Sequence, residues 1–357
     1  MIIDLKEFFS TLFLSFGLSS SITSVIWALL SLVVLGLSAA IGVLVLVWLE
    51  RKISAEVQQR IGPEYAGSFG FLQPLIDGLK LFLKENFFPR NSKQFLYRLG
   101  PVIVLLPSFL SFLIIPLSKA TLLTDNQSGI FLWLAVASIA PIGLLVSGYA
   151  ANNKYSFLGA LRATSQTISY ELPLTFATLA LCVIAEGLNV FDIIQSQAKF
   201  GILSLNIWRQ PIGFATFFLS ALAESERLPF DLPEAEEELV AGYQTEYTGI
   251  TFGLFFVASY VNVLLFSFFI TVFYLGGWVP PINKIFFIDQ PQLQVLFNVV
   301  SIFLTLLKVY SVVFVIILIR WTVPRIRIDQ LLNLGRKFLL PLSLGNLFLT
   351  ATFHFLA

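Results

Sequence analysis

Long apolar segments without charged residues recur along the whole chain. A helix needs about 20 mostly apolar residues to cross a bilayer core of roughly 30 Å. By this measure the sequence predicts an all-α, polytopic integral membrane protein with about eight transmembrane helices, organised as a single membrane domain over residues 1–357. The predicted spans are Ile22–Leu49, Leu99–Ser118, a segment within 126–153, Ala163–Ala185, Ile207–Glu226, a segment within 247–283, Gln292–Ile319 and Phe338 to the C-terminus.

Some of these spans contain or border ionisable side chains. Glu171 lies in the fourth span and Lys308 in the seventh, while the fifth ends in the carboxylates Glu224 and Glu226. An ionisable group inside a span is costly and normally faces the bundle interior, a partner or water. Lys308 is either a buried counter-ion or a side chain that extends toward the membrane surface.

The positive charges indicate which connections share a side of the membrane. Most of the 22 Lys and Arg residues fall between spans 1 and 2, 3 and 4, 5 and 6, and 7 and 8. By the positive-inside rule these connections lie on the cytoplasm-equivalent side, and both termini lie on the opposite side.

The first long loop, residues 50–98, begins with the charged run Glu50–Lys52 and contains an amphipathic segment between Phe71 and Phe88. Its polar residues recur every three or four positions, at Gln73, Asp77, Lys80 and Lys84. This spacing predicts an interfacial helix with an apolar stripe toward lipid or a neighbouring helix. A surface helix with no role beyond packing explains the pattern equally well.

The connection between spans five and six, residues 224–246, is strongly acidic. Only Arg227 opposes its eight carboxylates, which are Glu224, Glu226, Asp231, Glu234, Glu236, Glu237, Glu238 and Glu246. If such a cluster is partly buried, the carboxyl pKa values rise and the groups titrate as a coupled set. A row of these groups leading toward Glu171 would make a proton path through the membrane. The alternative is a solvated acidic loop that binds nothing.

Composition excludes several classes of protein. Apolar residues make up 57% of the chain and charged residues 12%, which is too little charge for a soluble enzyme. The net charge of +1 predicts no nucleic-acid partner. With Cys182 as the only cysteine and His354 as the only histidine, the chain is expected to hold no metal, cluster or cofactor by itself.

Five stretches carry a resemblance to a known family. They are Leu49–Lys52 with Gln59–Pro63, Ser169–Glu171, Leu222–Glu234, Gly242–Tyr247 and Pro324–Leu331. In these stretches the chain resembles subunit 1 of the complex I superfamily, the membrane subunit that forms much of the quinone chamber. The resemblance covers essentially the whole chain and implies a subunit that is catalytic only within its assembly.

Within the superfamily, residues 206–212 and 152–159 resemble the branch found in the photosynthetic NAD(P)H dehydrogenase-like complexes of chloroplasts and cyanobacteria. That resemblance implies plastoquinone as substrate, ferredoxin as donor and proton translocation across the thylakoid membrane. It also implies that both termini lie in the lumen, that the long loops lie in the stroma, and that lipid surrounds the subunit. Expected partners are the iron–sulfur arm, which would hold the clusters, and antiporter-like membrane subunits.

The resemblance assigns roles to individual residues. It places Arg51, Arg60, Phe230 and Asp231 at the quinone site, and Arg325 and Arg327 at the chamber rim or a neighbouring subunit. The implied proton relay consists of Glu171, Glu224, Asp231, Glu234, Glu236, Glu238 and Glu246. Three alternatives remain open: a mitochondrial or bacterial complex I subunit 1 using ubiquinone, a stand-alone proton-coupled transporter using Glu171 and Lys308, and a structural anchor for an electron-transfer arm.

Overall fold

The structure is a computed structural model that describes residues 20–118, 127–198, 201–231, 241–279 and 291–356. The described residues form helices and no strands. The α-helices are α2 Ser20–Val57, α3 Gln73–Leu83, α4 Gln94–Ser111, α5 Gly129–Ala137, α6 Ala140–Ala150, α7 Lys154–Ala185, α8 Val190–Gln197, α9 Asn206–Arg209, α10 Pro211–Glu224, α12 Gly249–Tyr274, α13 Pro291–Thr322, α14 Ile328–Asn333 and α15 Leu340–Leu356. Shorter 3-10 turns are η1 Ser68–Gly70, η2 Phe112–Ile114, η4 Gly201–Ser204 and η5 Gly242–Gln244, and η6 Leu334–Leu339 is π-helical.

Within the described residues, seven helical stretches are long and apolar enough to cross a membrane. The prediction of an all-α polytopic membrane protein is confirmed. The difference from eight lies at the predicted fifth span, where α10 has only 14 residues. At 1.5 Å per residue this helix is roughly 21 Å long, shorter than the bilayer core. The helical conformation is interrupted at Gln210, directly before Pro211, so that α9 and α10 do not form one helix.

The first span continues farther than its apolar run. Helix α2 extends through Glu50, Arg51 and Lys52 to Val57, so the start of the predicted loop is helical. Glu, Arg, Lys and Ala are good helix formers, and their side chains can reach a polar environment at a membrane surface. The helix ends where Gln59 takes a left-handed backbone conformation (φ +54°) and the Arg60 N–H donates to the Ala55 carbonyl.

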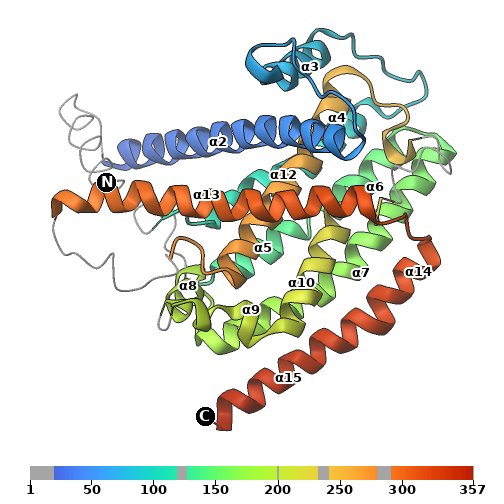
Figure 1. Ribbon diagram of the computed structural model, residues 1–357. Helices are drawn as coiled ribbons and strands as arrows, with labels where there is room; N and C mark the ends of the chain where they lie inside the picture. The colour runs from blue at the N-terminus through green and yellow to red at the C-terminus, as the bar shows by residue number, and fades with distance from the viewer. Residues whose placement is uncertain (1–19, 119–126, 199–200, 232–240, 280–290, 357) are drawn as a thin grey trace.

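Two long helices lie side by side across one face of the bundle. Figure 1 shows α2 and α13 running in the same direction, with their C-terminal ends close to each other, and α3 packs against α2. Helix α7 packs against α6, α10 and α15, while α12 passes through the interior and contacts α2, α4 and α13. This arrangement brings the end of α2, the end of α13 and the connection after α10 to the same end of the molecule.

Aromatic side chains on α12 form the centre of the core. The rings of Trp133 and Phe269 stack with centroids 3.9 Å apart, and Phe217 packs edge-on against Phe273 at 5.7 Å. Each of these side chains is almost fully buried. Offset and edge-to-face aromatic pairs stabilise such a core beyond the area they bury.

The amphipathic segment of the first loop forms helix α3, as predicted, over the shorter range Gln73–Leu83. Its end is set by Lys84, whose backbone is extended. The following residues are held by α12, because Phe87 N–H donates to Thr248 Oγ1 and Asn86 Oδ1 accepts from Ile250 N–H, each at 3.0 Å. Helix α3 is thereby anchored at its C-terminal side.

The environment of Lys308 differs from both expectations, a buried counter-ion and a side chain that extends toward the membrane surface. Its Nζ donates to the backbone carbonyls of Leu275 and Gly277 at 2.8 Å and of Val279 at 3.1 Å. These carbonyls follow the end of α12, where the helix dipole favours a cation. The ammonium therefore caps α12, and among the described residues it is backbone carbonyl oxygens that compensate its charge.

Candidate functional site

The acidic connection after α10 begins with a tightly held segment, Ser225–Asp231, which we call the loop root. Gln166 of α7 is buried, and its Nε2 donates to the backbone carbonyls of Ala223 (2.8 Å) and Phe230 (2.7 Å). The Phe230 ring is buried against that of Tyr170, with centroids 5.8 Å apart. One side chain of α7 thus fixes the backbone just before the loop root and near its end.

Two carboxylates from different helices lie together beside the loop root. Glu171 of α7 is close enough to Glu224, the last residue of α10, for their charges to interact. Glu224 Oε2 is shielded from solvent and has no hydrogen-bond partner among the residues that the structure describes. Carboxylates in such surroundings titrate as a coupled pair, because ionising one opposes ionising the other.

A cavity adjoins Glu224, between α4, α6, α7 and α12. Glu224 and Glu226 lie on its wall. Hydroxyl and amide groups line it as well, among them Ser108, Ser111, Thr167, Ser259 and Asn262. Such groups can donate or accept hydrogen bonds, so they can support water or a moving proton inside the bundle.

The far end of the acidic connection is held against the loop root and α7. Tyr243 Oη donates to Glu226 Oε2 at 3.1 Å, which joins the two ends of the connection. Glu246 Oε1 accepts from Asn153 Nδ2 at 2.7 Å, and Asn153 also caps the N-terminus of α7. Burial raises the pKa of the neighbouring Tyr247 phenol, which therefore stays protonated and donates to the Ser147 carbonyl at 3.2 Å.

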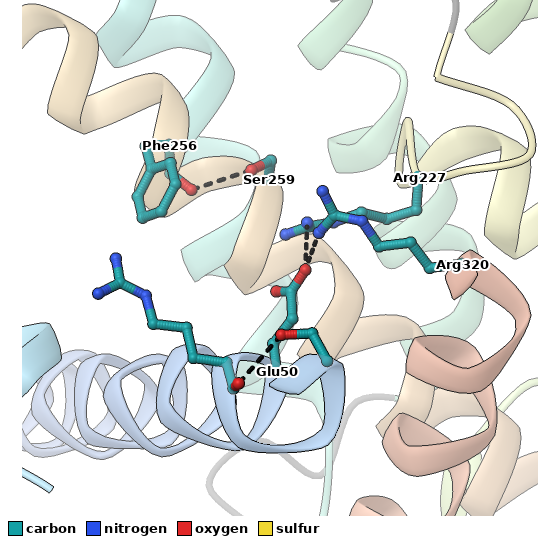
Figure 2. Close-up of polar contacts among 7 residues, drawn as sticks. Glu50, Arg227, Phe256, Ser259 and Arg320 are labelled. Carbon is teal, nitrogen blue, oxygen red and sulfur yellow. Dashed lines mark hydrogen bonds and ion pairs between the residues drawn. The ribbon is translucent and has the colours of Figure 1, made fainter. Parts of the chain in front are cut away.

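A second charged cluster ties the loop root to two membrane helices. Figure 2 shows the guanidiniums of Arg227 and Arg320 meeting at the carboxylate of Glu50. Arg227 Nη1 lies 3.5 Å from Glu50 Oε1, the same oxygen that pairs with Arg320 Nη1. The Arg227 guanidinium also lies over the Tyr260 ring, 4.0 Å from its centroid. Glu50 is only 7% exposed, so this ion cluster is largely desolvated.

The family model described as NADH dehydrogenase matches residues 29–351, which include all of these groups. The chain belongs to this family. It is the complex I subunit 1 family, so the chain is a membrane subunit of a complex I-like quinone oxidoreductase and works with other complex I-type subunits. The resemblance seen in the sequence is confirmed at this level.

For this family member, the sequence prediction placed Arg51 and Arg60 at the quinone site. Arg51 Nη1 pairs with Asp77 Oδ2 of α3 at 2.6 Å, and the Trp48 indole N–H donates to the Phe69 carbonyl at 3.1 Å. Arg60 is exposed, and its Nε donates to Gln58 Oε1 at 2.6 Å. Arg51 therefore faces α3, whereas Arg60 lies just after the end of α2.

The predicted residues Asp231, Arg325 and Arg327 lie where the connection between α13 and α14 meets the loop root. Asp231 Oδ2 is 3.8 Å from Arg325 Nη2, and Ile326 N–H donates to the Pro229 carbonyl at 3.2 Å. Arg327 is exposed at the start of α14. The connection between α13 and α14 thus covers the loop root.

The predicted relay residues are brought together only in part. Glu171 and Glu224 form a pair, whereas Asp231 lies at Arg325 and Glu246 at Asn153. Three further predicted relay residues, Glu234, Glu236 and Glu238, lie outside the described residues. Within the described part of the chain, no group of three or more His, Cys, Asp or Glu side chains is arranged to hold a metal ion.

Sequence reasoning missed the roles of Glu50, Gln166 and Arg320. Arg320 follows an apolar run and was counted only as a positive charge at the end of a span. Gln166 is an uncharged residue in a helix, and nothing in its spacing indicates which carbonyls it binds. Glu50 gave the one usable signal, because an acid placed before two bases at the end of a span is unusual where positive charges dominate.

Proposed function

We propose that this subunit forms the membrane side of the quinone site and relays protons through carboxylates into the membrane domain. The observation that carries the proposal is the pair Glu171 and Glu224 beside a cavity that Glu226 also lines. Reducing a quinone to a quinol consumes two electrons and two protons. A charge change at the quinone alters the proton affinity of nearby poorly hydrated carboxylates, so it can move protons along them.

The proposal assigns electron transfer to the partner subunits, and quinone binding and proton exchange to this chain. The partner subunits deliver electrons through iron–sulfur clusters, and this chain binds the quinone and supplies protonatable groups. Arg51 faces α3, whose exposed apolar side chains face the surroundings, and Arg60 follows just after the end of α2. Phe230 is buried, so its proposed role is to hold Asp231 at the edge of the quinone site.

The relay starts at the loop root and ends at Glu171. Asp231 lies at the outer edge, Glu226 and Glu224 line the cavity, and Glu171 continues the path on α7. Glu246 belongs to the same acidic connection and is oriented by Asn153. Glu234, Glu236 and Glu238 complete the proposed relay between these two ends.

The proposed quinone is plastoquinone, with ferredoxin as the electron donor and a chloroplast thylakoid membrane as the location. The support is the resemblance of residues 206–212 and 152–159 to the photosynthetic branch. The positive connections would then face the stroma and both termini the lumen. Arg327, exposed at the start of α14, would contact the iron–sulfur arm, and the antiporter-like subunits would continue the proton path.

The test replaces Glu224 by Gln in the complete complex in sealed native vesicles. Glu224→Gln keeps the size of the side chain and removes its proton exchange, so coupled quinone reduction and proton translocation should both fall at least tenfold, about 1.4 kcal/mol in the barrier. Glu56→Gln is the matched control, because Glu56 is an exposed carboxylate on α2. Normal translocation per electron in Glu224→Gln, with normal assembly, would overturn the relay and leave a structural role.

A further inference from the structure

The buried Glu50 cluster stands apart from the carboxylates of the proposed relay, and its geometry is unusual. Two cations share a single carboxylate oxygen, since both Arg227 Nη1 and Arg320 Nη1 pair with Glu50 Oε1. Arg227 Nη2 is buried and has no hydrogen-bond partner among the residues that the structure describes. The position of Arg227 therefore depends on Glu50 and on the ring of Tyr260.

The three charged residues come from segments far apart in the sequence. Glu50 belongs to α2, Arg320 lies near the end of α13, and Arg227 is in the loop root. Figure 2 shows the three side chains converging at the end of α2. The next residue on α2, Arg51, pairs with Asp77 of α3. Adjacent residues on a helix point about 100° apart. The end of α2 thus holds α3 on one side and the loop root on another.

We infer that Glu50 is a positioning residue, which holds the loop root in a fixed position relative to α2 and α3. The inference rests on the proposed function, because the loop root presents Glu226 and Asp231. Arg227 transmits the effect through its backbone, since its carbonyl accepts from Phe230 N–H at 2.8 Å. Phe230 is in turn the residue next to Asp231. Fixing the Arg227 guanidinium therefore fixes the segment that carries both carboxylates.

Removing the Glu50 charge has a defined electrostatic consequence. The guanidiniums of Arg227 and Arg320 would then face each other without a shared anion, in a site where little water screens their repulsion. Arg320 is the more exposed partner, with 30% of its side chain accessible against 13% for Arg227. Both can move, but only Arg227 moves the loop root with it.

The experiment compares Glu50→Gln with the charge exchange Glu50→Arg/Arg320→Glu in the complete complex. Glu50→Gln should speed amide hydrogen exchange in residues 225–231 and lower quinone turnover about tenfold, because small displacements at a reaction site are costly. The exchanged pair keeps the net charge but puts a cation next to Arg227 in place of the shared carboxylate, so it should restore neither. Glu56→Gln, the same chemical change on the exposed side of α2, should alter neither.

Two outcomes would overturn the inference. One is unchanged amide exchange in residues 225–231 of Glu50→Gln. The other is faster exchange with unchanged turnover and unchanged KM for quinone, which would leave the cluster with a structural role only. If Glu50→Gln does not assemble, Glu50→Asp keeps the charge and shortens its reach, and an intermediate turnover is expected, with wild-type turnover contradicting the inference. The proposed function is judged separately by Glu224→Gln, so the two can fail independently.

Discussion

At the scale of single residues, Tyr243 connects the two ends of the acidic connection. Its hydroxyl donates to Glu226 Oε2 and accepts from Gln244 Nε2, each at 3.1 Å. Its ring packs edge-on against Phe255, with centroids 5.2 Å apart, and is nearly fully buried. The hydroxyl is therefore held in place by the core while it touches a carboxylate of the proposed relay.

Replacing Tyr243 by Phe should slow coupled quinone reduction roughly tenfold, because a hydrogen bond to a charged acceptor contributes about 1.5 kcal/mol or more. The ring and its packing remain, so assembly should be normal. The measurement is quinone-driven proton uptake in sealed vesicles. Tyr155→Phe is the control, since Tyr155 is an exposed tyrosine near the start of α7. Equal rates of proton uptake in both variants would show that the Tyr243 hydroxyl has no role in the relay.

The residues of the site differ in how far the sequence reveals them. The acidic connection and Glu171 stand out because charge near or inside apolar segments is rare, and the structure brings Glu171 and Glu224 together. Gln166 does not stand out, because its role depends on carbonyl positions that exist only after folding. The burial of Phe230 was likewise not foreseen, since a motif gives the identity of a residue and not its exposure.

At the scale of elements, α7 is the helix on which the site is built. It carries Gln166, Tyr170 and Glu171, and its N-terminal part lies against the far end of the acidic connection. The contact is very close at Gly159, where an added Cβ would lie 2.6 Å from Gly242 Cα. Gly242 itself has a φ of +54°, so it cannot easily adapt to a bulkier neighbour.

Gly159→Ala should therefore displace the segment that holds Tyr243 and Glu246, or destabilise the subunit by about 1–3 kcal/mol through overpacking. Thermal inactivation of the purified complex measures this effect, which should appear as a lower midpoint temperature. Gly36→Ala is the matched control, because nothing lies within 4 Å of a Cβ added there. Identical midpoints for the two variants would contradict the close approach.

The apolar pattern predicts the helices better than their ends. It locates α4, α7, α12, α13 and α15 because each contains a long apolar run. The apolar pattern ends the first helix before the first charged residue, although α2 continues to Val57. Hydropathy indicates which residues can lie in the bilayer, and it does not measure helix propensity. It also predicts one span at 207–226, where the break at Gln210 leaves the shorter α10.

At the scale of the whole molecule, the outer helices leave much apolar surface uncovered. Leu29, Val33 and Leu37 of α2 and Phe348 and Phe353 of α15 are each more than half exposed. A membrane subunit of this family places such surface against lipid or neighbouring subunits. The polar groups of the site gather instead at one end of α2 and α13 and along α7.

In the proposed function, poorly hydrated carboxylates change their protonation when the quinone is reduced. Infrared difference spectroscopy of the intact complex, reduced minus oxidised, measures this directly, because a protonated carboxylic acid gives a carbonyl band separate from that of a carboxylate. We expect such a band in the wild-type complex and in Glu56→Gln, and its loss or shift in Glu224→Gln and Glu171→Gln. A difference spectrum with the same carboxylic acid bands in all four complexes would contradict it.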